Sequence, residues 1–149
     1  MQPGIEPDNG LLSAVEQELT VLLRRARGAY HRAAKEFDPD MDPAAYGLLL
    51  RLDEVGSCRV TDLAAFFGIG KPTVSRQLQM LEQSGLVRRH ADAEDARAVR
   101  FALTEAGAGR LAAVRRARRE RLRAGLAVWP AEDIAELGRL LARFNATEF

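Results

Sequence analysis

Apolar side chains recur at intervals of three and four residues over much of the chain, which predicts a mainly helical protein. The first such run predicts a long helix over residues 11–37. After the break DPDMDP, a second run predicts a helix over 43–55, with Asp42 as its N-terminal cap and Gly56 at its end. Residues 1–10 contain two prolines and two glycines but no such period, so we expect a mobile N-terminal arm.

Residues 61–85 contain two helical patterns that are separated by Gly68 and Gly70. We expect Thr61 to cap the first helix and Ile69 to fill the turn. The second helix, over 72–84, has an apolar stripe formed by Val74, Leu78 and Leu81. Its other side carries Pro72, Thr73, Arg76, Gln79 and Met80. One packed face and one free face are typical of the recognition helix in a helix-turn-helix.

Two short strands are expected after this helix, around Val87 and Phe101, whose side chains should face the core. Arg88, Arg89 and Arg100 should be more exposed. The acidic, alanine-rich stretch between the strands predicts a hairpin tip, which gives a wing over residues 91–99. Residues 57–60 can add a small third strand. The pattern therefore predicts a winged helix-turn-helix over about 43–103.

The C-terminal part predicts a helix from Glu105 to Val128, a stop at Pro130 and a final helix from Ala131. The final helix carries an apolar seam of Ile134, Leu137, Leu141 and Phe144. A monomer of this size would struggle to cover the seam, so we expect a homodimer joined by helices over about 11–37 and 105–149. The predicted fold class is mainly α with a small β-wing, in a single domain over 11–149.

The net charge of +1 does not indicate a nucleic-acid-binding protein, but basic charge is concentrated locally. Seven arginines and one acid, Glu120, lie between Arg110 and Arg123, a run that a solvated helix face would explain equally well. No stretch approaches the roughly 20 consecutive apolar residues of a membrane helix, and the N-terminus lacks the pattern of a signal peptide. We therefore expect a cytoplasmic protein without a membrane partner.

Motifs of enzymes and metal sites are missing from the sequence. The two histidines, His31 and His90, are far apart, and no Gly-rich phosphate-binding loop follows a strand. Cys58 is the single cysteine, which excludes an internal disulfide and a Cys-based zinc site. We expect no enzymatic activity, no metal and no cofactor.

The succession LAAFFGIGKPTVSRQLQMLEQSGLVRR, DAEDAR and FALTEAG resembles the MarR (multiple antibiotic resistance regulator) family of winged-helix transcription factors. The resemblance covers about residues 11–149, and its most specific part is Asp92, Asp95 and Arg97 followed by LTEAG. It implies a dimeric transcriptional regulator that binds double-stranded DNA at a specific sequence. The family's usual mode further implies repression at an inverted-repeat operator, relieved by a small ligand.

The resemblance also implies roles for single residues. Thr73, Arg76 and Pro72 match the base-reading positions of the family, where an arginine can donate two hydrogen bonds to guanine. Contacts to the phosphate backbone are expected from Lys71, Ser75, Gln77, Gln79 and the strand residue Arg88. Arg97 matches the arginine that enters the minor groove. Asp95 either orients Arg97, if both lie on one face of an extended strand, or neutralises it in a surface salt bridge.

Regulation is expected through a small aromatic or anionic effector. Residues that could line its cavity are Arg27, Tyr30, His31, Tyr46 and Leu50, although a plain core or surface position is the simpler explanation for each. Two alternatives stay open. The winged helix could dock a protein, which would favour exposed apolar side chains over the polar, basic face seen here. Redox sensing through Cys58 is the weaker alternative, because family members that sense peroxides carry their cysteine near the start of the first helix.

Overall fold

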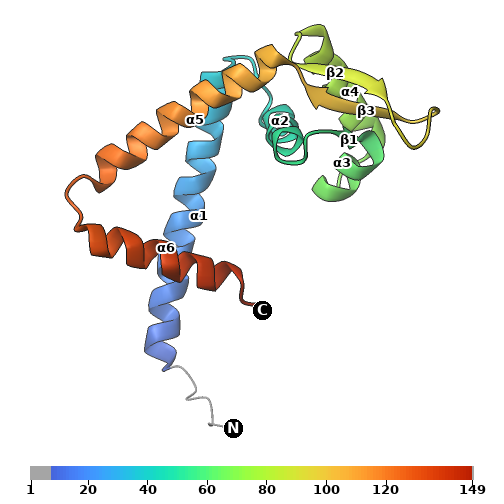
Figure 1. Cartoon of the computed structure of the whole chain (residues 1–149). Coiled ribbons are helices and arrows are strands. Elements are labelled where there is room, and N and C mark those ends of the chain that lie inside the picture. The colour runs from blue at the N-terminus through green and yellow to red at the C-terminus, as the bar shows by residue number, and fades with distance from the viewer. Residues whose placement is uncertain (1–7, 149) are drawn as a thin grey trace. The chain divides into compact units, whose positions relative to one another are not determined.

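The computed structural model describes residues 8–148 and confirms a mainly helical fold with a small antiparallel sheet (Figure 1). In chain order the elements are α1 Asn9–Phe37, α2 Pro43–Val55, β1 Cys58–Arg59, α3 Val60–Phe67, α4 Lys71–Gln83, β2 Val87–Ala91, β3 Val99–Leu103, α5 Glu105–Leu126 and α6 Ala131–Asn145. The chain forms two compact units, one ending at Leu111 and the other beginning at Ala112. Each unit is described by itself.

The caps of α1 and α2 explain where these helices begin. The carboxylate of Asp8 accepts the backbone N–H of Gly10 at 3.2 Å, and α1 therefore starts at Asn9, two residues before the predicted boundary. The rest of the predicted arm, residues 1–7, lies outside the described residues. α2 has the predicted bounds, because Asp42 Oδ1 accepts the N–H of Ala44 at 2.9 Å and Gly56 ends the helix with a positive φ of 79°.

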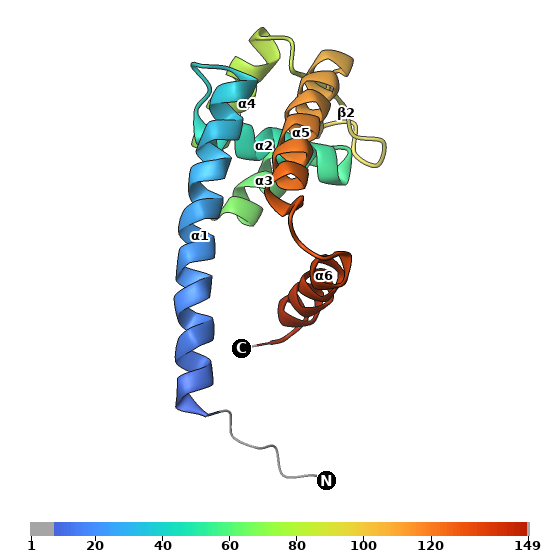
Figure 2. The same cartoon turned by 90° about the vertical axis from the view of Figure 1, so that its left-hand side faces the viewer.

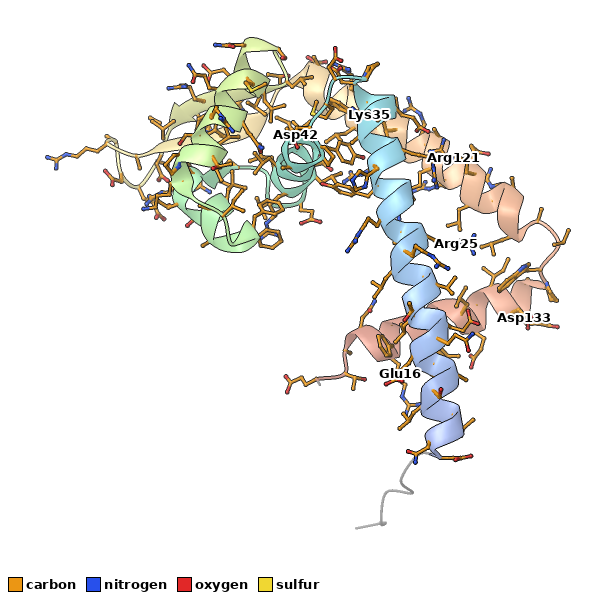
Figure 3. The ribbon with its side chains drawn as sticks, turned by 180° about the vertical axis from the view of Figure 1, so that it is seen from behind. Glu16, Arg25, Lys35, Asp42, Arg121 and Asp133 are labelled. Carbon is orange, nitrogen blue, oxygen red and sulfur yellow. The ribbon has the colours of Figure 1, made fainter. Side chains whose placement is uncertain are left out.

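The ends of α1 and α2 meet at a short connection, where Figure 3 shows Asp42 near the end of α1 that carries Lys35. The ammonium group of Lys35 donates to the carbonyl oxygen of Pro39 at 2.8 Å. In the same unit, the guanidinium of Arg110 donates to the carbonyl oxygen of Phe37 and lies 4.5 Å from the centre of the Phe37 ring. The first contact fixes the connection after α1, and the second joins the C-terminal end of α1 to the start of α5.

The three strands form a sheet in the order β1-β3-β2. Cys58 pairs with Phe101, and the hairpin of β2 and β3 runs from the pair Val87–Leu103 to the pair Ala91–Val99. The wing tip therefore spans residues 92–98 (Figure 1). β1 leads directly into α3, which begins at Val60 after the cap residue Arg59. The prediction that Thr61 caps this helix is therefore wrong.

The core of the first unit is formed by apolar side chains of α2, α3, α4, the sheet and the start of α5. The largest of them that are fully buried are Leu48, Leu49, Leu52, Leu63, Val74, Leu78, Leu86, Val87 and Leu111. Ile69 does not fill the turn after α3, since 38% of it is exposed. The turn is closed instead by Gly68, with a φ of 64°, and by the backbone N–H of Ile69, which donates to the carbonyl oxygen of Ala64.

Several apolar side chains of α1 and α6 remain exposed. Figure 2 shows that the N-terminal half of α1 extends past the other elements of its unit. On this half Leu11, Leu12, Val15, Leu22 and Leu23 are all exposed. In the second unit α6 has no buried residue, although it carries Ile134, Leu137, Leu140 and Leu141. Among residues 8–148, no helix combines the length and the hydropathy needed to cross a membrane.

Candidate nucleic-acid interface

α4 presents a polar surface to solvent because its apolar stripe fixes its rotation on the core. Val74, Leu78 and Leu81 are at most 3% exposed and lie on one side of the helix. The opposite side is exposed and consists of Lys71, Pro72, Thr73, Ser75, Arg76, Gln79 and Met80. The predicted base-reading residues therefore lie together on the free face of the helix.

Gln77 does not belong to this surface. Only 7% of it is exposed, and its Oε1 has no hydrogen-bond partner among residues 8–148. A phosphate group would have little access to this side chain, because it lies beside Leu78 on the packed side of α4. We therefore drop the predicted phosphate contact of Gln77.

The N-terminus of α4, which begins at Lys71, carries the positive end of the helix dipole. The cap residue is Gly70, which has no side chain to accept the free N–H groups of the first turn. Pro72 fits this first turn because its nitrogen carries no hydrogen. Together with the ammonium group of Lys71, this helix end favours an anion such as a DNA phosphate.

The cationic side chains of the winged helix fall into two groups. Arg59 and Arg100 form ion pairs with Asp92, Arg89 pairs with Glu82 at 2.8 Å, and Arg51 pairs with Glu54 at 3.0 Å. In contrast, Lys71, Arg76, Arg88 and Arg97 are exposed and take part in no ion pair with any residue of 8–148. The unpaired cations are those for which contacts with DNA are predicted above.

Asp92 holds the base of the wing, a role that the sequence did not reveal. Its side chain is 4% exposed, and its Oδ2 accepts the Nε–H of Arg59 at 2.9 Å and an N–H of Arg100 at 3.1 Å. Its Oδ1 accepts the backbone N–H of Glu94 at 2.9 Å. The hydrogen bond from Arg59, followed by those from Glu94 and Arg100, holds the pKa of Asp92 well below its usual range. The carboxylate is therefore a permanent anion at neutral pH.

Arg100 is half-buried, in contrast to the prediction that it is exposed. Besides its bond to Asp92, its guanidinium donates to the hydroxyl of Ser57 at 2.9 Å and to the carbonyl oxygen of Ser57 at 2.8 Å. These bonds turn the side chain back across the sheet, so it cannot reach outward. Ser57 lies two residues before Arg59, which is the residue opposite Arg100 in the sheet. The sequence could have indicated this contact only if the register of the strands had been known.

Asp95 and Arg97 lie in a turn and not on an extended strand, which corrects the predicted geometry. Asp95 Oδ1 accepts the backbone N–H of Arg97 at 3.0 Å, and its carbonyl oxygen accepts the N–H of Ala98 at 2.9 Å. The guanidinium of Arg97 forms no ion pair with a described residue. Asp95 thus shapes the backbone before the arginine and leaves its charge free.

Exposed apolar side chains, which would favour protein docking, lie mostly beside the free face of α4: Phe66 and Phe67 on α3, Ile69 in the turn and Val99 on β3. Met80 is 59% exposed on α4, and Phe66 is 56% exposed on α3. The ring of Phe66 is covered by the guanidinium of Arg51, whose central carbon lies 4.0 Å from the ring centre. The free face of α4 is therefore polar and basic in its larger part, which favours an anionic partner.

Two of the predicted effector residues, Tyr30 and Tyr46, form contacts between α1 and α2. The Tyr30 hydroxyl donates to the carbonyl oxygen of Pro43 at 2.8 Å, and the Tyr30 and Tyr46 rings are 5.4 Å apart. Tyr46 is buried, and His31 Nδ1 lies 2.8 Å from the carbonyl oxygen of Arg27. Leu50 is half-buried. These contacts give the side chains of Tyr30, His31 and Tyr46 a structural role without a ligand.

Cys58 is a poor candidate for a redox sensor. The residue is 8% exposed on β1, and burial raises the pKa of its thiol, with a further rise from the charge of Asp62. A thiol with a raised pKa contains little thiolate, which is the species that peroxides oxidise. The structure therefore favours an inert core cysteine.

Comparison with known proteins agrees with this geometry. A family model described as MarR family matches residues 40–98. YxaD of Bacillus subtilis (strain 168), an uncharacterized HTH-type transcriptional regulator, is 35% identical over 131 residues, which cover 88% of this chain and 90% of YxaD. Among solved structures, RV1404 from Mycobacterium tuberculosis has a TM-score of 0.81 at 18% identity, covering 96% of this chain and 97% of the other. A mutant of S. aureus MepR bound to an oligodeoxyribonucleotide has a TM-score of 0.62 at 21% identity, covering 86% and 96% of the two chains. From the extent and identity of the match to YxaD and from the winged helix described above, we conclude that the chain belongs to the MarR family of DNA-binding transcriptional regulators.

Proposed function

We propose that this regulator acts as a homodimer that binds an inverted-repeat operator and represses transcription until a small ligand releases it. The observation that carries the proposal is the exposed face of α4, where Thr73 and Arg76 lie opposite a buried apolar stripe. Arg76 forms no ion pair with any residue that the structure describes. A helix with this division can enter the major groove with its packed side still on the core.

Within this proposal, base edges are read from α4. The guanidinium of Arg76 can donate two hydrogen bonds to a guanine, and Pro72 and Thr73 can contact a thymine methyl group. Lys71, Ser75, Gln79 and the strand residue Arg88 would contact phosphates and fix the register without selecting a sequence. All of these side chains are exposed.

The wing would make the third contact. Arg97 is exposed at the tip of the hairpin and its charge is free, which suits a narrow A·T-rich minor groove with its concentrated negative potential. The acidic neighbours do not argue against this contact, because Asp92 pairs with Arg59 and Arg100 and Asp95 binds backbone N–H groups.

The dimer is supported by the uncovered apolar side chains. We propose that helices within 11–37 and 105–149 form the interface, while the winged helix of residues 43–103 contacts DNA. Leu12 and Val15 of α1 and Leu137 and Leu141 of α6 are between 39% and 49% exposed, more apolar surface than single helices usually leave in water. A two-fold axis would place two copies of α4 in successive major grooves.

Relief of repression by a ligand would require contacts that connect the dimer helices to the winged helix. The hydrogen bond from Tyr30 of α1 to Pro43 of α2 is such a contact, and the rings of His31 and Tyr46 lie beside Tyr30. Arg27 lies three residues before Tyr30 on α1, and Leu50 lies four residues after Tyr46 on α2. An aromatic or anionic compound that displaced Tyr30 would change how α1 meets α2. Such a change would alter the separation of the two recognition helices.

Footprinting with the purified protein on the DNA flanking its own gene tests the proposal. We expect two protected patches related by an inverted repeat, with centres roughly 10 bp apart on one side of the duplex. Binding to random DNA of equal length, at the same salt concentration, is the control. A uniform, salt-sensitive protection without any preferred site would contradict a sequence-specific function.

A further inference from the structure

The carboxylate of Asp92 joins three segments at the base of the wing. Oδ2 accepts guanidinium N–H groups from Arg59 of β1 and Arg100 of β3. Oδ1 accepts the backbone N–H of Glu94, which starts the tip, and the N–H of Asp92 itself donates to the carbonyl oxygen of Ala98 at 3.0 Å. Both ends of the tip are therefore fixed at one residue.

The two arginines connect the Asp92 carboxylate to the rest of the winged helix. Arg59 is the residue directly before α3, and it pairs with Arg100 across the antiparallel strands. Arg100 in turn binds the hydroxyl and the carbonyl oxygen of Ser57. Without the carboxylate, two guanidinium groups would face each other on paired strands with no anion between them, which is unfavourable.

The tip itself is short, so its direction depends on this anchor. After the turn at Asp92, the second turn at Asp95 holds the backbone N–H of Arg97 and of Ala98. Within residues 92–98 the acceptors of these bonds belong to the tip itself, and Asp92 is the one acceptor among them whose side chain is buried. The position of Arg97 therefore follows from Asp92 and the two arginines that hold it.

We propose that Asp92, held by Arg59 and Arg100, is a positioning residue that directs Arg97 toward the minor groove. The inference rests on the proposed minor-groove contact of Arg97. It assigns Arg59 and Arg100 to the orientation of the wing and removes them from direct contact with DNA, although both are basic residues of the winged helix.

A double-mutant cycle on operator binding tests the proposal. Affinity is measured at one salt concentration for the wild type, Asp92→Asn, Arg97→Ala and the double variant, on operators with A·T-rich or G·C-rich flanks. On A·T flanks we expect each single variant to lose on the order of tenfold in affinity and the double variant to be no weaker than Arg97→Ala. On G·C flanks all four should differ little. Glu94→Gln is the matched control, because Glu94 contributes only its backbone N–H to the network.

The outcomes separate the inference from the proposed function. If Arg97→Ala weakens binding and Asp92→Asn adds its full loss to it, Asp92 does not act through Arg97 and the inference is wrong. If Arg97→Ala has no effect on either operator, the wing contact of the proposed function is wrong and the inference falls with it. Losses of equal size on both kinds of flank would also overturn the inference.

A second variant and a spectroscopic readout cover the case in which Asp92→Asn unfolds. Arg59→Gln keeps the carboxylate of Asp92 and its bond to Arg100, so this variant should fold. Its loss of operator affinity should be smaller than that of Asp92→Asn and should likewise not add to the loss caused by Arg97→Ala. Amide hydrogen exchange should be faster at Glu94 and Arg97 in both variants, with exchange in α4 unchanged. Unchanged exchange at these two amides would contradict the positioning role.

Discussion

The hydroxyl of Tyr30 donates a hydrogen bond to the carbonyl oxygen of Pro43 at 2.8 Å, which joins α1 to the first turn of α2. Gly47, one turn further along α2, makes room for this contact, since a Cβ atom there would lie only 2.7 Å from the Tyr30 hydroxyl oxygen. Burial, and then the charges of Tyr46 and Asp42, raise the pKa of Tyr30. The hydroxyl thus remains a donor throughout the physiological pH range.

Tyr30→Phe should lower the free energy of unfolding by about 0.5–1.5 kcal/mol, because it removes one partly buried hydrogen bond. Gly47→Ala should cost about 1–3 kcal/mol in the wild type through crowding, and less when combined with Tyr30→Phe. Urea unfolding of the four proteins at one protein concentration measures both effects. Strict additivity would show that the two positions do not meet as described.

Two glycines on α5 should respond to alanine in opposite directions. A Cβ at Gly107 would collide with the carbonyl oxygen of Leu86, which is backbone and cannot move away easily, whereas nothing lies within 4 Å of a Cβ at Gly109. Gly107→Ala should therefore destabilise the fold by about 1–3 kcal/mol or more. Gly109→Ala should stabilise it by up to roughly 1 kcal/mol through helix propensity. Thermal unfolding of both variants decides this, and equal effects would contradict the close packing at Gly107.

Local sequence signals were sufficient where caps and periodicity decide the structure. Asp42, Pro43 and Gly56 gave the bounds of α2, because each acts on its own turn of backbone. The apolar stripe of Val74 and Leu78 predicted the rotation of α4. The same logic predicted the strands, since Val87 and Phe101 are buried as expected.

Contacts across the sheet were not predictable from spacing alone. Arg100 looked like a surface residue, because its partners Ser57 and Asp92 are 43 and 8 residues away and are brought close only by strand pairing. The spacing of Asp95 and Arg97 also fits an extended strand, because the sequence does not show that β3 begins only at Val99. Gln77 lies at the border of the packed stripe, and only the neighbouring elements decide whether such a residue is covered.

Stability should depend on pH through Asp92. The folded-state pKa of this carboxyl is lowered, chiefly by the hydrogen bond from Arg59, so its contribution is complete above the ordinary Asp pKa of about 3.9 and is lost as the pH falls through the lower folded value. The difference in unfolding free energy between the wild type and Asp92→Asn should stay constant between roughly pH 5 and 8 and shrink below about pH 4. Urea titrations across this range provide the measurement. A difference that grows on acidification would have the wrong sign.

The dimer should depend on the exposed seam of α6. Leu137→Glu places a charge among the apolar side chains Ile134, Leu140 and Leu141. An obligate interface on this seam would bury upwards of about 2,000 Å², so the charge would lose its contact with water in the dimer. The variant should therefore shift toward monomer in sedimentation experiments. Arg139→Gln is the control, since Arg139 lies on the other side of α6 and only loses its exposed bond to Glu136. A wild-type protein that sediments as a folded monomer at micromolar concentration would exclude the dimer.

The affinity of Arg76→Ala for operator and for random DNA, at one salt concentration, tests the central claim that the free face of α4 reads bases. We expect the difference in binding free energy between operator and random DNA to shrink by roughly 1–3 kcal/mol per half-site, because a bidentate contact to guanine is lost. Lys71→Ala serves as the comparison and should weaken both complexes alike while reducing the salt slope by about 1 per contact. An Arg76→Ala protein whose ratio equals that of the wild type would contradict the assignment of α4 as the recognition helix.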